Sequence, residues 1–163
     1  MLITFSGLPG TGKSTIARLL ARQLSAVYLR VDSVEQALRV ADQPIGPEGY
    51  FVTYAVAREN LLLGSTVITD SVNDLMQIRD AYRDIALLSG TEILEVEIIC
   101  SDKNKHRFRV ENRVADIKGH ILPSWQAVEQ REYQPWLRER LQLDSALLSA
   151  QQCVDRIVLE MNG

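Results

Sequence analysis

Residues 1–15 read MLITFSGLPGTGKST, and the rest of the chain is arranged around this stretch. It begins with Leu2, Ile3 and Phe5 in an apolar run that is typical of a buried strand. The pattern G-x-x-x-x-G-K-[ST] follows, and after it apolar side chains recur at helical spacing. A glycine-rich loop between a strand and a helix is the context in which this pattern indicates a phosphate-binding loop rather than an ordinary turn.

Each residue type in this loop has a physical role. Gly7 and Gly12 can adopt positive φ angles and carry no Cβ, so successive backbone N–H groups can turn toward phosphate oxygens. Lys13 can reach the β- and γ-phosphates, and the Ser14 hydroxyl is placed to coordinate Mg²⁺. We therefore predict that the chain binds a nucleoside triphosphate through the loop residues Gly7, Leu8, Pro9, Gly10, Thr11, Gly12, Lys13, Ser14 and Thr15.

Length and composition predict one ordinary globular domain. The 163 residues can bury a full core without disulfides, and Cys100 and Cys153 have no metal-like spacing. A net charge of −3 excludes a general attraction to nucleic acid, although a local basic patch stays open. No apolar run reaches the length of a membrane span, and the chain starts with a strand rather than a signal peptide. We therefore expect no membrane association and a cytoplasmic location.

Short apolar runs alternate with helical patterns along the chain. The predicted strands are 1–6, 27–31, 65–69, 93–100 and 141–143. The predicted helices after the first are 33–40, 50–63, 75–88, 102–114, 123–136 and 147–161. This alternation indicates an α/β fold in which a five-stranded parallel sheet carries helices on both faces. Ligands of such sheets bind at the carboxyl ends of the strands, and Asp32, Asp70, Asp102 and Asp144 each fall at such an end.

Several stretches give the chain a resemblance to the small P-loop kinases: GLPGTGKST, VITDSVN, VEIICSDKNKHRFRVENR, PSW…REYQPW and LQLD. This group includes chloramphenicol phosphotransferase, adenylylsulfate, shikimate and gluconate kinases, and zeta-toxin and polynucleotide-kinase type domains. The chain looks most similar to the bacterial AAA-domain ATPase and kinase-like proteins. The resemblance implies a three-layer P-loop NTPase fold with strand order 2-3-1-4-5, in one domain over 1–163. It also implies a small helical lid at about 104–122, called the predicted lid below.

The same resemblance implies roles for two of the aspartates. In the strand order 2-3-1-4-5, Asp70 lies beside Lys13 and Ser14, where it can hold Mg²⁺ through water. Asp32 faces the acceptor side, where these kinases place a carboxylate that accepts the hydroxyl proton. Either aspartate could instead be catalytically central, and the sequence leaves that choice open.

Both aspartates also have simpler interpretations. Asp32 with Glu35, or Ser33 with Gln36, spells a helix capping box, in which the side chains satisfy the first N–H groups of the helix. Asp70 can simply end a strand. A capping role and a catalytic role can coexist at one helix start.

The segment 102–113 is rich in basic side chains. Arg109 and Arg113 are four residues apart and share one face of a helix. By resemblance to the kinase lid, Arg109 would contact adenine and Arg113 the transferring phosphate. The alternative is a solvated basic face with Glu111 as partner. No aromatic stacking platform accompanies these charges, which argues against a nucleic-acid patch, and His106 receives no role.

Aromatic residues outside these motifs are interpreted first as packing groups. Trp125, Tyr133 and Trp136 recur near helical spacing, which favours a core or an interface. The stretch Tyr50–Tyr54 contains aromatic side chains that could line an acceptor pocket. Gly119 could act as the pivot of the lid, but the motif that follows this position in adenylylsulfate kinases is not present, which counts against adenylylsulfate as acceptor.

The leading hypothesis is a kinase that transfers the γ-phosphate of ATP·Mg²⁺ to a hydroxyl group of a small molecule. Lys13, Asp32 and Arg113 would be its catalytic residues, Arg109 would join the loop in binding ATP, and Ser14 with Asp70 would hold the metal. The alternatives are a slow ATPase that acts as a nucleotide-dependent switch and a polynucleotide 5′-kinase. The sequence lacks a guanine-reading N/T-K-x-D motif, which favours ATP. It leaves the acceptor and the oligomeric state open.

Overall fold

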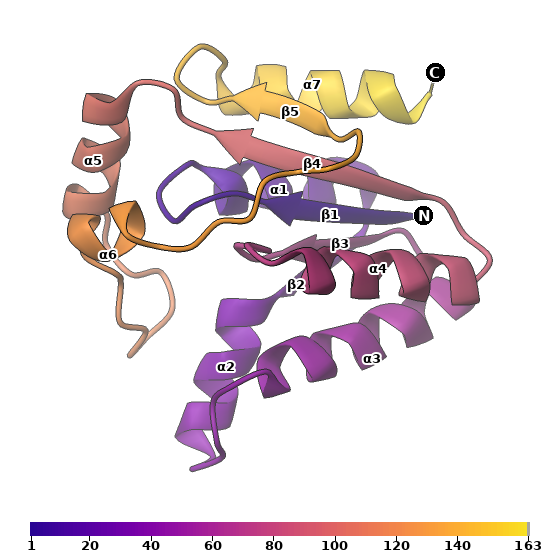
Figure 1. Ribbon diagram of the computed structural model, residues 1–163. Coiled ribbons are helices and arrows are strands. Elements are labelled where there is room, and N and C mark those ends of the chain that lie inside the picture. The colour runs from indigo at the N-terminus through magenta and orange to yellow at the C-terminus, as the bar shows by residue number, and fades with distance from the viewer. Residues whose placement is uncertain (163) are drawn as a thin grey trace.

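The strand β1 (Leu2–Ser6) lies in the middle of a parallel sheet, and helices cover both faces of that sheet (Figure 1). The computed structural model describes residues 1–162. The other strands are β2 (Val27–Arg30), β3 (Val67–Asp70), β4 (Ile93–Ile99) and β5 (Leu141–Asp144). The helices are α1 (Lys13–Leu24), α2 (Val31–Val40), α3 (Glu48–Leu62), α4 (Met76–Leu88), α5 (Lys103–Asn112), α6 (Trp125–Glu129) and α7 (Ala150–Met161).

The sheet has the order β2-β3-β1-β4-β5, which confirms the predicted order 2-3-1-4-5. Each pair of neighbouring strands is parallel, so all carboxyl ends lie at one edge of the sheet. In the register, Phe5 of β1 lies beside Asp70 of β3, and Asp70 lies beside Arg30 of β2. The ends of β2 and β3 are therefore next to the loop that follows β1.

Side chains of β1 alternate between two hydrophobic clusters, because successive residues of a strand point to opposite faces of a sheet. Ile3 and Phe5 belong to the cluster beneath α1 and α7, whereas Leu2 belongs to the cluster beneath α3 and α4. All three side chains are fully buried. Figure 1 shows these two pairs of helices on opposite sides of the sheet. This arrangement is the three-layer α/β/α fold that was expected.

The predicted helix 123–136 is wrong over most of its length. Only α6 is helical, and the segment 131–140 runs as an irregular strap over the sheet. Pro135 disfavours a helical conformation at Gln134, the residue before it. The carbonyl oxygens of Gln134 and Pro135 instead accept hydrogen bonds from the guanidinium group of Arg79. Arg79 is distant in the sequence, so a local pattern could not indicate this contact.

Two helix starts also differ from the prediction. β2 ends at Arg30 and α2 begins directly at Val31, so Asp32 lies inside the first turn of the helix. The last helix begins at Ala150, where Ser149 and Gln152 form a reciprocal capping box. At α5 the N-cap is Asp102, whose side chain accepts a hydrogen bond from the backbone N–H of Lys105.

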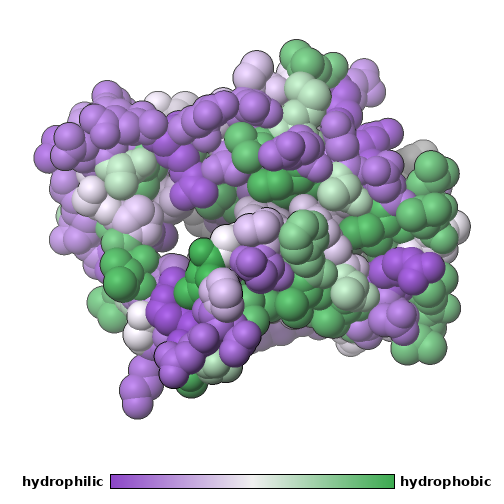
Figure 2. Space-filling view, turned by 60° about the horizontal axis from the view of Figure 1, so that its bottom comes forward, coloured by the Kyte–Doolittle hydropathy of each residue, from purple (hydrophilic) through white to green (hydrophobic). Residues whose placement is uncertain are grey.

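Helix α3 leaves apolar side chains exposed on the face that Figure 2 turns toward the viewer, where hydrophobic residues gather. They are Phe51, Val52, Val56 and Leu62, and Leu63 directly after the helix is exposed as well. None of them lines the large cavity described below. Among residues 1–162, no helix is both long enough and apolar enough to cross a membrane.

Candidate active site

The loop between β1 and α1 has the backbone geometry that its glycines permit. Gly7 has a φ angle of 132°, and a Cβ atom there would lie 2.2 Å from the carbonyl oxygen of Ile98 on β4. Gly12 occupies the N-cap position of α1 with a φ angle of 98°. The first turn of a helix leaves N–H groups without partners inside the helix, and the helix dipole adds a positive end. The loop and α1 therefore present a site suited to phosphate oxygens.

The Lys13 side chain is folded back over this loop. Its Nζ donates a hydrogen bond to the carbonyl oxygen of Leu8 at 2.9 Å, and the residue is only 7% exposed. Burial lowers the pKa of Lys13 to about 8, although the nearby carboxylates of Asp70 and Asp32 oppose this effect. An ammonium group that is buried and only partly compensated is ready to exchange its carbonyl contact for phosphate oxygens.

Asp70 ends β3 and lies almost fully buried next to the loop. Its Oδ2 accepts a hydrogen bond from the Tyr28 hydroxyl at 2.6 Å and lies 3.9 Å from Nε of Arg30. Asp70 and Ser14 both line the same cavity as Lys13. Within residues 1–162 no group of three or more His, Cys, Asp or Glu side chains could hold a metal by itself. One hydroxyl and one carboxylate fit Mg²⁺, which takes its remaining ligands from phosphates and water.

Asp32 faces the cavity without acting as a helix cap. The N-cap residue of α2 is Arg30, and no side chain caps this helix, so the capping-box interpretation of Asp32 and Ser33 is wrong. Oδ2 of Asp32 instead accepts hydrogen bonds from Nε and Nη2 of Arg30, at 3.3 Å and 3.1 Å. The carboxylate is 37% exposed and lines the cavity, where an acceptor group can reach it.

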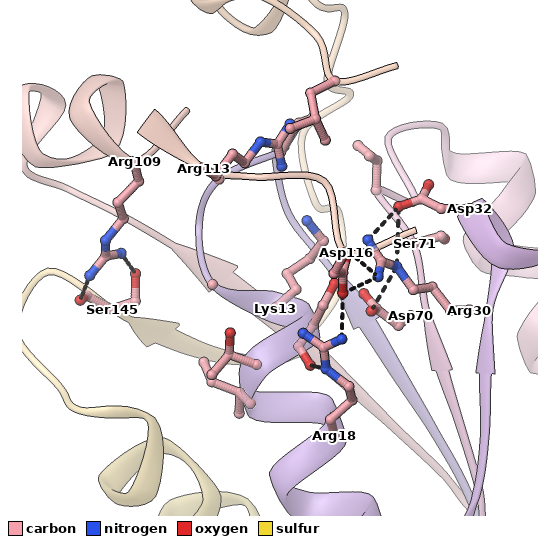
Figure 3. Close-up of a pocket in the computed structure, with 18 of the residues that line it drawn as sticks. Lys13, Arg18, Arg30, Asp32, Asp70, Ser71, Arg109, Arg113, Asp116 and Ser145 are labelled. Atoms are coloured by element: carbon pink, nitrogen blue, oxygen red, sulfur yellow. Dashed lines mark hydrogen bonds and ion pairs between the residues drawn. The ribbon is translucent and has the colours of Figure 1, made fainter. Parts of the chain in front are cut away.

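A cavity of about 970 Å³ brings most of the predicted site residues together (Figure 3). Those that line it are Pro9, Gly10, Gly12, Lys13, Ser14, Thr15, Asp32, Asp70, Arg109 and Arg113. Gly7, Leu8 and Thr11 belong to the loop but do not line the cavity. Of the aromatic candidates on α3, Tyr50 lines the cavity, whereas Tyr54 packs edge-on against Tyr82 with ring centroids 4.8 Å apart.

Arg109 and Arg113, the two arginines predicted to act in a lid, point to different parts of this cavity (Figure 3). Arg109, on α5, donates hydrogen bonds to the hydroxyl and carbonyl oxygens of Ser145 at 2.8 Å and 3.0 Å. Arg113 follows the last residue of α5 and lies nearer Lys13. Its Nε is buried and has no hydrogen-bond partner among the described residues. Burial lowers the pKa of Arg113, as expected for a cation without full compensation.

His106 contacts the loop directly, although no role was predicted for it. Its Nε2 lies 2.8 Å from the carbonyl oxygen of Pro9, and its ring packs edge-on against Trp125. A carbonyl oxygen can only accept, so Nε2 of His106 carries the proton and donates it, and burial lowers the pKa of this ring. Val110, one turn later, meets Gly10 of the loop. The spacing of His106 and Val110 was the available sequence signal, because it places both on one face of α5.

Asp116 is a second residue that the sequence did not reveal. It lies in the irregular segment between α5 and α6 and joins two arginines at the cavity (Figure 3). Its carboxylate accepts from Nη1 of Arg18 at 2.5 Å and from Nη1 of Arg30 at 2.9 Å and 3.0 Å. Burial raises the pKa of Asp116, but the hydrogen bonds from Arg18 and Arg30 outweigh it and lower the pKa to about 2.

Comparison with solved structures finds the same fold in nucleotide-dependent proteins. Kti12 from Chaetomium thermophilum, solved with ADP-AlF3, matches with a TM-score of 0.74 at 20% identity, over 100% of both chains. The adenylylsulfate (APS) kinase CysC of Mycobacterium tuberculosis, in complex with AMPPNP and APS, has a TM-score of 0.70 at 17% identity, over 99% of this chain and 97% of that one. A gluconokinase from Sinorhizobium meliloti has a TM-score of 0.65 at 18% identity, over 98% and 94%.

At these identities the structural matches establish the P-loop fold and nothing finer. No curated protein matches the chain in sequence. A family model described as "AAA domain" matches residues 2–133, which is most of the chain and includes the loop, the proposed metal site and the predicted lid. The protein therefore belongs to this AAA-domain family, within the P-loop kinase-like fold.

Proposed function

We propose that this protein is a phosphotransferase that moves the γ-phosphate of ATP·Mg²⁺ to a hydroxyl group of a small molecule. The observation that carries this proposal is the composition of one cavity. It joins a phosphate-binding loop with Lys13, a buried carboxylate at Asp70, a second accessible carboxylate at Asp32, and arginines that reach in from the opposite side. The APS kinase and gluconokinase among the structural matches support a small-molecule acceptor.

The nucleotide phosphates would lie on the loop and the first turn of α1. Lys13 would then leave the carbonyl oxygen of Leu8 and contact the β- and γ-phosphates. Ser14 and Asp70 would hold Mg²⁺, which neutralises charge on the phosphate oxygens when it is bound. We place adenine between Arg109 and the loop after β5, because Arg109 is held against Ser145 and residues 146–148 line that end of the cavity.

The acceptor would lie at the other end of the cavity, beside α2. Asp32 would accept the proton of the attacking hydroxyl while the new oxygen–phosphorus bond forms and the bond to the β-phosphate oxygen breaks. Arg113 would balance the charge on the transferring group. Glu35, Tyr50 and Arg131 line this end of the cavity and offer polar contacts to the rest of the acceptor.

Slow ATP hydrolysis coupled to a conformational change is the second candidate function. The match to Kti12, which was solved with ADP-AlF3, leaves this candidate open. In this case water would take the place of the acceptor hydroxyl, and the predicted lid would adopt different conformations with ATP and with ADP bound.

The deciding experiment measures ATP consumption across hydroxylated metabolites, antibiotics and short oligonucleotides, with and without Mg²⁺. Strong stimulation by one small acceptor supports the kinase, whereas slow hydrolysis that no acceptor changes supports the switch. Stimulation only by oligonucleotide 5′ ends would instead support the polynucleotide kinase. Lys13→Ala serves as the control that should abolish ATP consumption in every case.

The substitution Asp32→Asn tests the proposed base separately from nucleotide binding. The amide keeps the size of the side chain but cannot accept the proton, so we expect the rate of transfer to fall by roughly 10²–10⁴-fold. The dissociation constant of ATP, measured by calorimetry, should stay within about threefold of wild type. Full transfer activity in Asp32→Asn would show that Asp32 is not the base.

A further inference from the structure

Arg30 lies at the centre of a charged cluster and has no role in the reaction proposed above. It is the last residue of β2, and its side chain is only 11% exposed. Three carboxylates from three different segments surround it: Asp32 on α2, Asp70 on β3 and Asp116 in the predicted lid (Figure 3). The closest contacts are to Asp32 and Asp116, and the contact to Asp70 is longer at 3.9 Å.

The guanidinium group of Arg30 divides its donors between Asp32 and Asp116. Nε and Nη2 face Asp32, whereas Nη1 donates to both carboxylate oxygens of Asp116. A guanidinium group is planar and rigid, so one orientation must serve both carboxylates. The contact with Asp116 therefore helps to orient the donors that face Asp32. Without Asp116, Arg30 would keep only its hydrogen bonds to Asp32 and the longer contact with Asp70, and the orientation of its guanidinium group would be less fixed.

Asp116 also reaches the nucleotide half of the site. Its second partner, Arg18, lies on α1 one turn after Ser14, and Nε of Arg18 donates to the Ser14 carbonyl oxygen at 3.1 Å. A single carboxylate of the predicted lid thus connects the helix that carries the proposed metal ligand with the strand that carries Arg30. The side chains of Arg18 and Asp116 are 43% and 41% exposed, so water can compete for this contact.

The predicted lid also touches α2 beside Asp32. A Cβ atom on Gly119, which has a φ angle of 81°, would lie 2.8 Å from Nε2 of Gln36. Asp116 and Gly119 are three residues apart, so this short part of the predicted lid lies next to Arg30, which precedes Asp32, and next to Gln36, which follows it. If the predicted lid opened, Asp116 would leave Arg30 and Gly119 would leave Gln36 together.

We propose that Asp116 and Arg30 are positioning residues, through which closure of the predicted lid sets the Asp32 carboxylate for phosphoryl transfer. The catalytic part of this inference rests on the proposed role of Asp32. The mechanical part does not, because it concerns the lid, Arg30 and Asp32 alone. In a site built in this way, the carboxylate of Asp32 is correctly placed to accept a proton only when the lid is closed and water is excluded.

The test compares Asp116→Asn and Asp116→Glu with the wild type. Asp116→Asn removes the charge at nearly constant shape, and Asp116→Glu restores it. The matched control is Glu111→Gln, which neutralises another lid carboxylate whose ion pair, with Arg107, lies outside the cavity. All proteins are saturated with the ATP analogue AMPPNP and Mg²⁺ for the two structural measurements, and with ATP and Mg²⁺ for the kinetic one.

The first structural measurement is amide hydrogen exchange of residues 113–123. The second is solvent exchange of the Arg30 Nε–H group by NMR, which reports its hydrogen bond to Asp32 directly. In Asp116→Asn we expect both exchange rates to rise at least tenfold. In Asp116→Glu they should return toward wild type, and in Glu111→Gln they should not change. Unchanged exchange of the Arg30 Nε–H group in Asp116→Asn would overturn the proposal, even if the lid amides exchange faster.

The kinetic measurement is ATP consumption, with water as acceptor where no other is found. We expect kcat to fall tenfold or more in Asp116→Asn, with KM for ATP within about threefold of wild type. An unchanged kcat beside faster Arg30 exchange would contradict the link to catalysis. If the wild type consumes no ATP under any condition, the proposed function fails, and the exchange measurements still decide whether Asp116 positions Arg30 and Asp32.

Discussion

At the residue scale, the ionisation of Lys13 links burial to nucleotide binding. Its pKa of about 8 belongs to the protein without nucleotide, in which burial opposes the charged form. Phosphate oxygens favour the ammonium form, so the pKa must rise when ATP binds. Binding then takes up a proton whenever the pH exceeds about 8. The affinity for ATP should be steady below that pH and should fall above it, approaching tenfold for each pH unit.

Calorimetric titrations of ATP between pH 7 and 9.5 would measure this dependence. Lys13→Arg is the matched control, because an arginine stays protonated throughout this range. Its affinity can be lower at every pH, but the loss above pH 8 should disappear. A wild-type profile without that loss would show that Lys13 remains charged in the free protein. The carboxylates of Asp70 and Asp32 would then offset the effect of burial on its pKa.

Single residues also show where a sequence pattern is sufficient and where it is not. Gly7, Gly12 and Lys13 could be placed in advance because the loop depends on neighbours in the chain. The role of Asp32 in α2 was harder to predict, because the sequence pattern fits a capping box, whereas the helix begins one residue before Asp32 and the carboxylate binds Arg30 instead. Asp116 could not be found either, since both its partners are more than eighty residues away.

At the element scale, the strap 131–140 depends on one buried cation of α4. Arg79 is 3% exposed and donates to the carbonyl oxygens of Asn73, Asp74, Gln134 and Pro135. Its guanidinium group also lies 4.2 Å from the centre of the Trp136 ring. Arg79 therefore ties the strap to the loop after Asp70. The spacing of Trp125 and Trp136 is compatible with a helix, but the hydrogen bonds from Arg79 stabilise the irregular conformation of the strap instead.

Replacing this cation should destabilise the fold strongly. Arg79→Met keeps most of the apolar volume but leaves buried carbonyl groups without donors, and we expect a loss of about 3 kcal/mol in the free energy of unfolding. Urea unfolding measures the change. The control Arg83→Met lies one turn later on α4, where the side chain is half exposed and its partner Glu95 is also bound by Arg138. It should cost less than about 1 kcal/mol. Equal losses in both variants would contradict a special role for Arg79.

At the scale of the whole molecule, the alternation of strands and helices was sufficient to predict a parallel sheet covered on both faces. The strand order needed more, because spacing alone does not say which strands are neighbours; it came from the resemblance to P-loop kinases. That order brings Asp70 and Arg30 beside the loop through the register of β1, β3 and β2. The contacts of the predicted lid with the loop and with Arg30 could not be predicted from the sequence, since they depend on His106, Asp116 and their distant partners.

The shared sheet also predicts how the molecule unfolds. Both hydrophobic clusters include side chains of β1 and β3, so neither face can lose its helices without exposing the strands that support the other. We therefore expect one cooperative thermal transition, as for a single domain.

ATP with Mg²⁺ should raise the midpoint of this transition, because a ligand at one hundred times its dissociation constant adds about 2.7 kcal/mol of stability. For a chain of this length that corresponds to roughly 5–10 °C. Calorimetry of the wild type and of Lys13→Ala, which should keep the transition but lose the shift, measures both effects. Two separate transitions would contradict a single domain, and a wild-type midpoint that ATP leaves unchanged would contradict nucleotide binding at the loop.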